Sequence, residues 1–122
     1  MKRLGEYFTL NESESYDLRP VNKEELIDII NQRIEEYGPK CNLNDIDVSR
    51  VKDMSNLFEN SEFDGDISQW DVSSVKDMSS LLTSSKFNGD LSKWDTSDVM
   101  DTCNMFVESP LEGKEPSWYE AN

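Results

Sequence analysis

Aspartates are the residues of this sequence whose spacing most clearly suggests chemistry, because two sets of them recur every 24 positions. The first set is Asp47, Asp71 and Asp95, and the second is Asp53, Asp77 and Asp101. Each aspartate of the first set has a serine two positions later, so its carboxylate can close a turn with that residue. We expect the second set to cap short helical turns, since a carboxylate is favoured at a helix N-terminus.

Cation binding is an alternative use of the acidic turns. The sequence Asp64-Gly65-Asp66, together with Asp90, offers carboxylate oxygens of the kind that calcium prefers. The loop lacks the full ligand spacing of a known calcium motif, and Asn88 replaces Asp64 in the next segment. We therefore expect no metal and no other cofactor, with calcium as the alternative.

Catalysis has little support in the residue types present. The chain has no histidine, which removes the commonest general base and the commonest zinc ligand. Cys103 would lack the basic partner of a nucleophilic cysteine. Because Cys103 occupies the column of Ser55 and Ser79, we expect a small side chain tucked into the structure, reduced like Cys41. The sequence predicts no catalytic residues and no enzyme activity.

A 24-residue repeat over positions 43–113 organises the rest of the chain. Apolar residues return at the same places in three successive segments, and a single segment cannot bury them alone. The columns are Leu43/Ile67/Leu91, Ile46/Trp70/Trp94, Val51/Val75/Val99, Leu57/Leu81/Met105, Phe58/Leu82/Phe106 and Phe63/Phe87/Leu111. The pattern predicts an α+β fold, a short three-repeat leucine-rich-repeat-like solenoid with an N-terminal capping helix.

The local signals predict the elements of each repeat. Apolar pairs after an aspartate indicate helical turns at Ser55–Asn60, Ser79–Ser84 and Thr102–Val107. Alternation predicts short strands at Ile67–Val72 and Leu91–Thr96, and the Asp-Gly and Asn-Gly pairs at 64–65 and 88–89 predict turns. The clearest helix covers residues 23–37, because Asn22 and Glu25 have the form of a capping box and Gly38-Pro39 ends the apolar period.

We divide the single domain into residues 1–42, the N-terminal segment and capping helix; 43–113, the three repeats; and 114–122, a C-terminal cap. Tyr7, Phe8 and Leu10 are expected to pack on the first layers. Trp118 and Tyr119 are expected to plug the other end, and Trp70 and Trp94 to lie in the core.

The net charge of −14 limits the possible partners. Residues 43–113 hold 15 of the 26 acidic and 5 of the 12 basic side chains, so the excess lies on the repeats. Nucleic acids and anionic membranes require basic clusters that are absent here. The acids that vary between repeats are the candidate partner-binding residues: Asp45, Glu59, Glu62, Asp98, Glu108 and Glu112. They form either a solvated face or a surface for a basic partner protein.

The segments WDVSSVKDMSSLL and KFNGDLSKWDTSDV resemble the BspA-like class of bacterial leucine-rich repeats, over residues 43–113. The lead-in before Leu43 also resembles small gut-bacterial and phage-borne members. The resemblance implies a binding function without catalytic residues. Many such proteins lie on cell surfaces, but the N-terminal residues here are unlike a secretory signal and no stretch is long enough to span a bilayer. We expect a cytoplasmic location in a bacterial host.

The sequence therefore predicts a non-catalytic module that binds and occludes a partner protein. The alternative is an acidic nucleic-acid mimic that inhibits a nuclease, restriction or CRISPR effector. Oligomeric state and the face that binds are left open, and end-to-end assembly is a further possibility.

Overall fold

The computed structural model describes residues 18–119. Within that range it has one helix, α1 (Lys23–Tyr37), and no β-strand. The β-type backbone pairing among these residues consists of isolated parallel bridges: Asn42 with Asp66, Asp53 with Asp77, and Asp77 with Asp101. The predicted α+β leucine-rich-repeat-like solenoid is therefore wrong, because the repeats form no sheet. Tyr7, Phe8 and Leu10 lie outside the described residues.

Helix α1 confirms the prediction for residues 23–37. The Asn22 side chain accepts the Glu25 N–H at 2.9 Å, and the Glu25 carboxylate accepts the Val21 N–H at 3.0 Å. The first bond satisfies a donor that a helix start leaves unpaired, and the second joins the residue before the N-cap to the first turn. At the other end Gly38 donates its N–H to the Ile34 carbonyl, and its φ of 90° ends the helix there.

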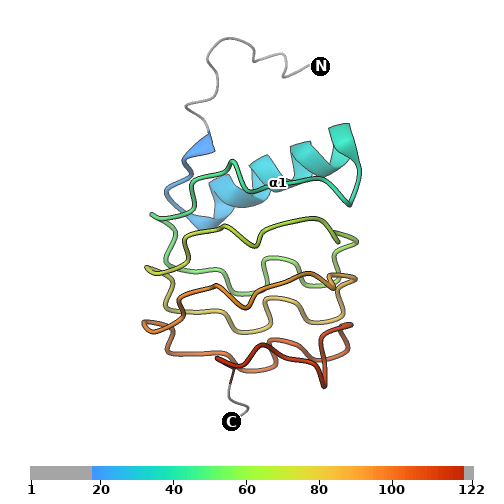
Figure 1. Ribbon diagram of the computed structural model, residues 1–122. Coiled ribbons are helices and arrows are strands. Elements are labelled where there is room, and N and C mark those ends of the chain that lie inside the picture. The colour runs from blue at the N-terminus through green and yellow to red at the C-terminus, as the bar shows by residue number, and fades with distance from the viewer. Residues whose placement is uncertain (1–17, 120–122) are drawn as a thin grey trace.

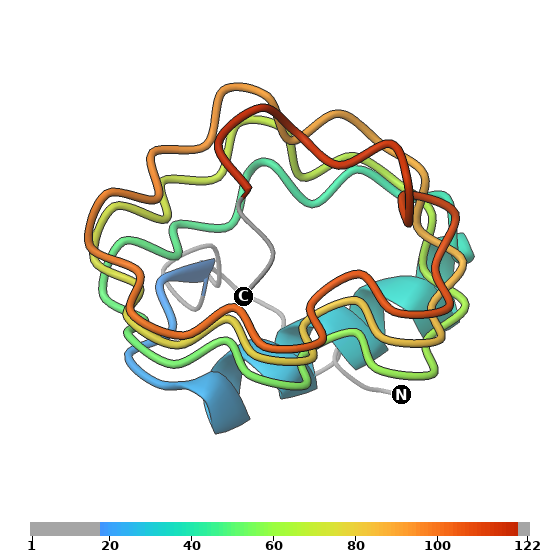
Figure 2. The same cartoon turned by 90° about the horizontal axis from the view of Figure 1, so that it is seen from below.

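The chain after α1 winds in successive circuits, each stacked on the one before (Figures 1 and 2). We call residues 43–66 coil 1, residues 67–90 coil 2 and residues 91–113 coil 3. Backbone hydrogen bonds join residues about one circuit apart, as from Phe58 N–H to the Leu81 carbonyl at 2.9 Å. Turns close each coil internally, as from Leu57 N–H to the Met54 carbonyl at 3.2 Å. The coils are thus built from turns and from bonds between coils.

The predicted strands at 67–72 and 91–96 are absent because turns interrupt them. Trp70 donates its N–H to Ile67, and Trp94 donates to Leu91, each three residues back. Such a bond closes a turn and prevents an extended run. The predicted helical turns are wrong as well. Asn56 and Asn60 have φ of 62° and 59°, and the same column positions in the next coils are also left-handed, at Ser80, Ser84, Asn104 and Glu108. A left-handed residue every fourth position excludes an α-helix.

The core confirms the predicted apolar columns. All but one of their members are buried, Val99 being partly buried, and two further columns, Val48/Val72 and Met54/Met78, join them. Phe63 and Phe87 stack at 5.9 Å between ring centroids. Leu26 and Ile30 of α1 belong to the same cluster, so the helix covers the first coil (Figure 1). Burial of these side chains supplies the main stabilisation of the stack.

Candidate functional site: the outer carboxylates of the coils

Aspartates close turns in three columns along the stack. Asp47 accepts both the N–H (3.0 Å) and the hydroxyl (2.6 Å) of Ser49, and Asp71 and Asp95 do the same with Ser73 and Ser97. This confirms the turn-closing role predicted for that set. A third column, Asn42, Asp66 and Asp90, accepts the N–H groups of Asn44, Ser68 and Ser92 and was missed in the sequence, although its Asp-x-Ser spacing was visible.

The second predicted set acts in the same way rather than as helix caps. Asp53, Asp77 and Asp101 accept the N–H groups two residues on, at 2.8–2.9 Å. The prediction that they cap helices is wrong because the following residues form left-handed turns. Coils 1 and 2 therefore each carry three side chains that close an Asx turn, and coil 3 carries two.

These turns keep several carboxylates charged. Hydrogen bonds from the Ser49 hydroxyl and N–H lower the pKa of Asp47, and the Ser68 N–H has the largest part in lowering the pKa of Asp66. Burial alone would raise the pKa of Asp53, but bonds from Ser55 and the nearby Lys23 lower it overall. Hydrogen bonds that favour the ionised form shift a carboxyl pKa downward.

The oxygens of the alternative calcium site have other partners. Asp64 accepts the Asn88 N–H at 2.8 Å and lies 3.4 Å from the Lys40 ammonium. Asp66 and Asp90 close their own turns. Within residues 18–119 no three carboxylate, cysteine or histidine side chains gather as metal ligands do. The arrangement favours turn closure over cation binding.

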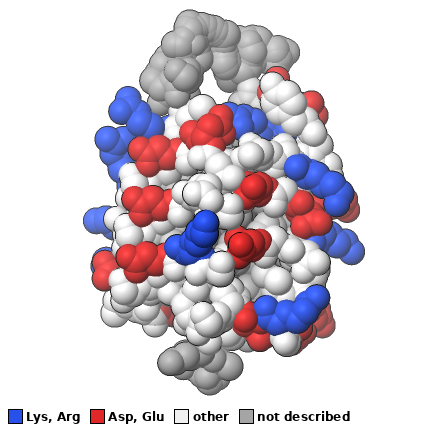
Figure 3. All heavy atoms as spheres, viewed as in Figure 1, with Lys and Arg blue, Asp and Glu red and all other residues white. Residues whose placement is uncertain are grey.

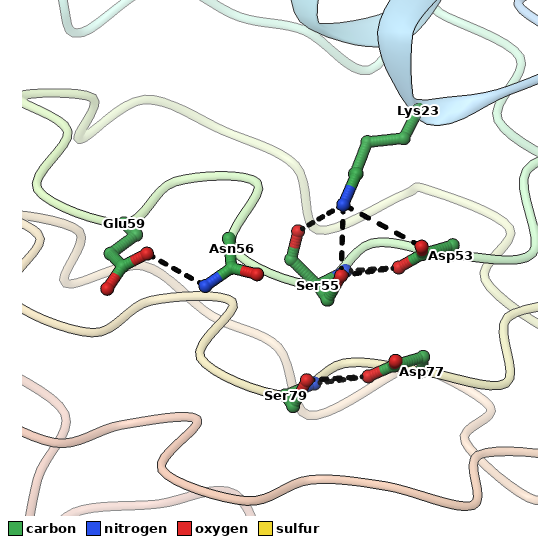
Figure 4. A network of polar contacts seen from close by, with 7 residues as sticks. All are labelled: Lys23, Asp53, Ser55, Asn56, Glu59, Asp77 and Ser79. Atoms are coloured by element: carbon green, nitrogen blue, oxygen red, sulfur yellow. Dashed lines mark hydrogen bonds and ion pairs between the residues drawn. The ribbon is translucent and has the colours of Figure 1, made fainter.

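Lys23 satisfies a backbone carbonyl at the first coil. Its ammonium donates to the Ser55 carbonyl at 3.1 Å and to the Ser55 hydroxyl at 3.0 Å, with Asp53 3.7 Å away. In the coils below, the equivalent carbonyl of Ser79 accepts a backbone N–H, that of Asn56. Figure 4 shows Lys23 reaching down from α1, with Asp77 and Ser79 arranged one coil below as Asp53 and Ser55 are. The lysine therefore takes the place of a preceding coil.

The six predicted partner-binding acids do not form one patch. Four of them, Glu59, Glu62, Glu108 and Glu112, are exposed and occupy neighbouring positions along the circuit; we call them the glutamate edge. Residues 83 and 84 connect the coils there. The Ser84 hydroxyl donates to the Glu108 carboxylate at 3.1 Å, and the Asn60 N–H donates to the Thr83 carbonyl at 2.9 Å. Glu59 accepts the Asn56 amide at 2.8 Å.

The other two acids lie elsewhere. Asp45 forms a two-pronged ion pair with Arg33 of α1, at 3.0 and 2.7 Å, which raises the pKa of Arg33 and occupies this carboxylate. Asp98 is exposed in the column of Arg50 and Ser74, away from the glutamate edge. The face in Figure 3 likewise carries acidic and basic side chains side by side.

The cysteines differ from their predicted setting. Both are free thiols, but Cys103 is exposed rather than tucked into the stack, and Cys41 is half-buried. Burial raises the pKa of the Cys41 thiol, which makes the thiolate less available. A hollow of about 430 Å³ beside the start of α1 was not foreseen; its charged lining residues are Lys23, Glu24, Arg50, Lys52 and Asp53.

Trp118 continues a column beyond the predicted repeats. The indole N–H groups of Trp70, Trp94 and Trp118 donate to the carbonyls of Leu43, Ile67 and Leu91, each 27 residues earlier, at 2.7–3.0 Å. Neighbouring rings stack at 6.4 Å. The 24-residue spacing of the three tryptophans was the signal for this column. The division into residues 1–42, 43–113 and 114–122 stays a prediction.

Stacked coils of Asx and left-handed turns, with a shared apolar core, define a repeat protein whose outer surface is set by turn residues. Residues 29–118 match the family described as "Mycoplasma protein of unknown function, DUF285", and the chain belongs to that family. No curated protein and no solved structure matches the sequence. Within residues 18–119, no helix has the length and apolar character needed to cross a bilayer.

Proposed function

We propose that this protein is a non-catalytic binding module that holds and occludes a partner protein with a basic surface. The observation that carries the proposal is the glutamate edge. Most aspartates of the coils are engaged in closing turns. Glu62 has no such role, and the carboxylates of Glu59 and Glu108 accept only from the short polar side chains of Asn56 and Ser84. Carboxylates left at a surface can pair with lysine and arginine of a partner.

The hydrogen-bonded backbone supports this role. The glutamates extend from turns that bonds between coils hold in place, so little ordering is needed when a partner binds. Charge complementarity contributes association rate and selectivity more than affinity. Occlusion is the simplest mechanism for a chain of 122 residues without histidine, and it requires no cofactor.

The test is capture from a nuclease-treated bacterial lysate with stepwise elution by salt and identification by mass spectrometry. A triple variant, Glu59→Gln, Glu62→Gln and Glu108→Gln, should fold normally and lose at least about tenfold in affinity for the captured partner. The matched control, Glu24→Gln, Glu35→Gln and Glu36→Gln, removes the same charge from exposed positions of α1. Equal binding by the two triple variants would reject the glutamate edge.

The second candidate is a nucleic-acid mimic that inhibits a nuclease, restriction or CRISPR effector. It is favoured by the exposed column of Asp47, Asp71 and Asp95, whose carboxylates are held in fixed turns one coil apart. This function predicts that DNA or RNA competes with the protein for its partner and that affinity falls steeply with salt. A captured partner that nucleic acid does not displace would reject it.

We also propose that the protein is a BspA-like member of this family. The resemblance of WDVSSVKDMSSLL to BspA-like repeats supports a bacterial protein used for binding, although the leucine-rich-repeat fold does not form. We further propose a cytoplasmic location in a bacterial host, no direct contact with nucleic acid or membrane, and no enzyme activity.

A further inference from the structure

Along residues 54–60 of coil 1 and 78–84 of coil 2, the backbone bonds to the next coil run in one direction, whereas elsewhere some run the other way, as from Lys76 N–H to the Lys52 carbonyl. In coil 1 the N–H groups of residues 54, 56, 58 and 60 donate to carbonyls 23 residues later, at 2.8–3.0 Å. In coil 2 the N–H groups of residues 78, 80, 82 and 84 do the same, at 2.8–3.0 Å. Each coil therefore offers four donors in a row to the coil that follows.

Coil 3 has the same row of donors, and no further coil follows it within residues 18–119. The equivalent residues are Thr102, Asn104, Phe106 and Glu108. Only the last has an acceptor among residues 18–119: the Glu112 carboxylate takes the Glu108 N–H at 3.0 Å, where a carbonyl of a next coil would lie. Trp118 and Tyr119 pack on Trp94 and Phe106. Figure 2, which views this end, shows the last residues over one side of the ring of chain. Unpaired donors in a row are a template for added backbone.

A second copy of the chain does not fit this row. The carbonyls that would accept from it belong to coil 1, and there α1 and the Lys23 ammonium already cover that end. Two copies meeting at their coil 3 ends would place donors against donors. We therefore take the acceptor to be a different polypeptide.

The charges around the row select a basic segment. Residues 95–113 contain five acidic side chains and no lysine or arginine: Asp95, Asp98, Asp101, Glu108 and Glu112. The same stretch of coil 2, residues 71–89, has two of each sign. Met100 is 82% exposed and Val107 is 38% exposed, so apolar contacts lie at both ends of the row.

We propose that the open edge of coil 3, residues 100–108, binds a basic segment of a partner protein. Alternate backbone carbonyls of that segment accept from Thr102, Asn104 and Phe106, and its lysines or arginines meet the surrounding carboxylates. The proposal rests on the proposed function as a protein-binding module and names where the partner's chain docks. Main-chain bonds would supply affinity while charge and Met100 supply selectivity.

The test uses the full chain and a peptide probe with blocked ends that copies residues 76–86, KDMSSLLTSSK. In the protein this segment presents carbonyls 77, 79, 81 and 83 to coil 1 in the required spacing. A ¹⁵N NMR titration at low salt should shift the amide signals of Thr102, Asn104 and Phe106 and slow their hydrogen exchange. Thr102→Pro removes one donor and should weaken peptide binding about fivefold.

Thr96→Pro is the matched control, because Thr96 and Thr102 each follow the aspartate of an Asx turn. Proline restricts the residue before it to extended backbone, and this restriction falls on an aspartate at both sites. Thr96 is equivalent to Val48 and Val72 in the earlier coils. Within the described residues the N–H groups of these two valines donate to no neighbouring coil, so position 96 does not belong to the row of donors. Should Thr102→Pro fail to fold, Asp98→Asn with Asp101→Asn tests the same edge. This pair should weaken the peptide more than Asp47→Asn with Asp71→Asn, which also preserves the turns.

The outcomes separate this inference from the proposed function. Shifts at the three amides of the native chain, together with weaker peptide binding by Thr102→Pro as read from Asn104 and Phe106, support the open edge of coil 3. Shifts confined to other residues, or none at millimolar peptide, overturn it. Changes at the same amides when protein concentration alone is raised overturn it in favour of self-association. If capture of a partner depends on the glutamate edge but not on Thr102, the proposed function is supported and binding at the open edge of coil 3 is rejected.

Discussion

Gly65 lies where coil 1 passes closest to the chain that leaves α1. A Cβ atom on Gly65 would lie 1.8 Å from the Cys41 carbonyl oxygen, a contact with backbone that cannot move aside cheaply. On Gly89 the nearest atom would be the Phe87 ring, at 2.6 Å, and the backbone of Gly65 is 3.4 Å away. The turns predicted for the Asp-Gly and Asn-Gly pairs do not form, and the two glycines are instead needed for close stacking, to different degrees.

Gly65→Ala should cost about 3 kcal/mol of unfolding free energy and Gly89→Ala about 1 kcal/mol, because forced overlap with backbone is worse than displacement of a ring. Urea unfolding followed by tryptophan fluorescence measures both. Equal losses would mean that the approach of the coils does not set the requirement for glycine.

Asp66 makes the stability of its turn depend on pH. The folded pKa of Asp66 is lowered, chiefly by the Ser68 N–H, from an unfolded value of about 3.9. The unfolded chain therefore binds the proton more readily. The stabilisation by Asp66 is present above about pH 4 and is lost as pH falls through the folded pKa.

Asp66→Asn should remove this dependence without removing the turn, because Asn42 closes the equivalent turn of the same column at 2.8 Å. The variant should be slightly less stable than the native chain at pH 6, and the difference should shrink or reverse at pH 3. Urea midpoints at the two pH values measure this. A constant difference would show that the Asp66 carboxyl does not titrate with folding.

The alternating turn of residues 78–84 is the element that the coils repeat, and left-handed positions control it. Ser80 has φ 56°, while Asn56 and Asn104 occupy the same column in the other coils. Asparagine tolerates this conformation better than serine, and β-branched residues tolerate it poorly.

Ser80→Asn should therefore raise the unfolding free energy by a few tenths of a kcal/mol, and Ser80→Val should lower it by about 1–2 kcal/mol. Ser74 is the control site, since it is likewise partly exposed but does not have positive φ. A comparable loss from Ser74→Val would assign the effect to valine at the surface and not to backbone conformation.

At the same scale, the sequence predicts α1 well and the coils poorly. Asn22, Glu25 and Gly38 are local signals that fix both ends of the helix. The segment after Asp53 is wrongly predicted as a helix. Its apolar pair, Leu57 and Phe58, fits both a helical turn and the left-handed turns that form. Bonds between coils decide it, and these join residues 23 apart. Ser80 and Glu108 carry no local signal for a left-handed turn.

The candidate site could be predicted only in part from the sequence. The period of 24 identifies the column of Asp47 and would also have placed Glu59, Glu62 and Glu108 near one another. It could not reveal that Arg33 occupies Asp45, since that pairing depends on where α1 lies against coil 1.

Over the whole molecule, excess negative charge opposes folding. The net charge is −14, and the acids of successive coils lie one above another, with three ion pairs among the described residues. Raising NaCl from 0.01 to 1 M shortens the screening length from about 30 Å to about 3 Å. The urea midpoint should therefore rise with salt, because repulsion between exposed acids is screened.

The two triple glutamine variants locate the repulsion. Glu59→Gln, Glu62→Gln and Glu108→Gln should flatten the salt dependence more than Glu24→Gln, Glu35→Gln and Glu36→Gln, because the first set lies along stacked coils and the second is spread along α1. A midpoint that falls with salt would show that ion pairs such as Arg33–Asp45 outweigh the repulsion. The glutamate edge would then lack the unbalanced negative field that attraction of a basic partner requires.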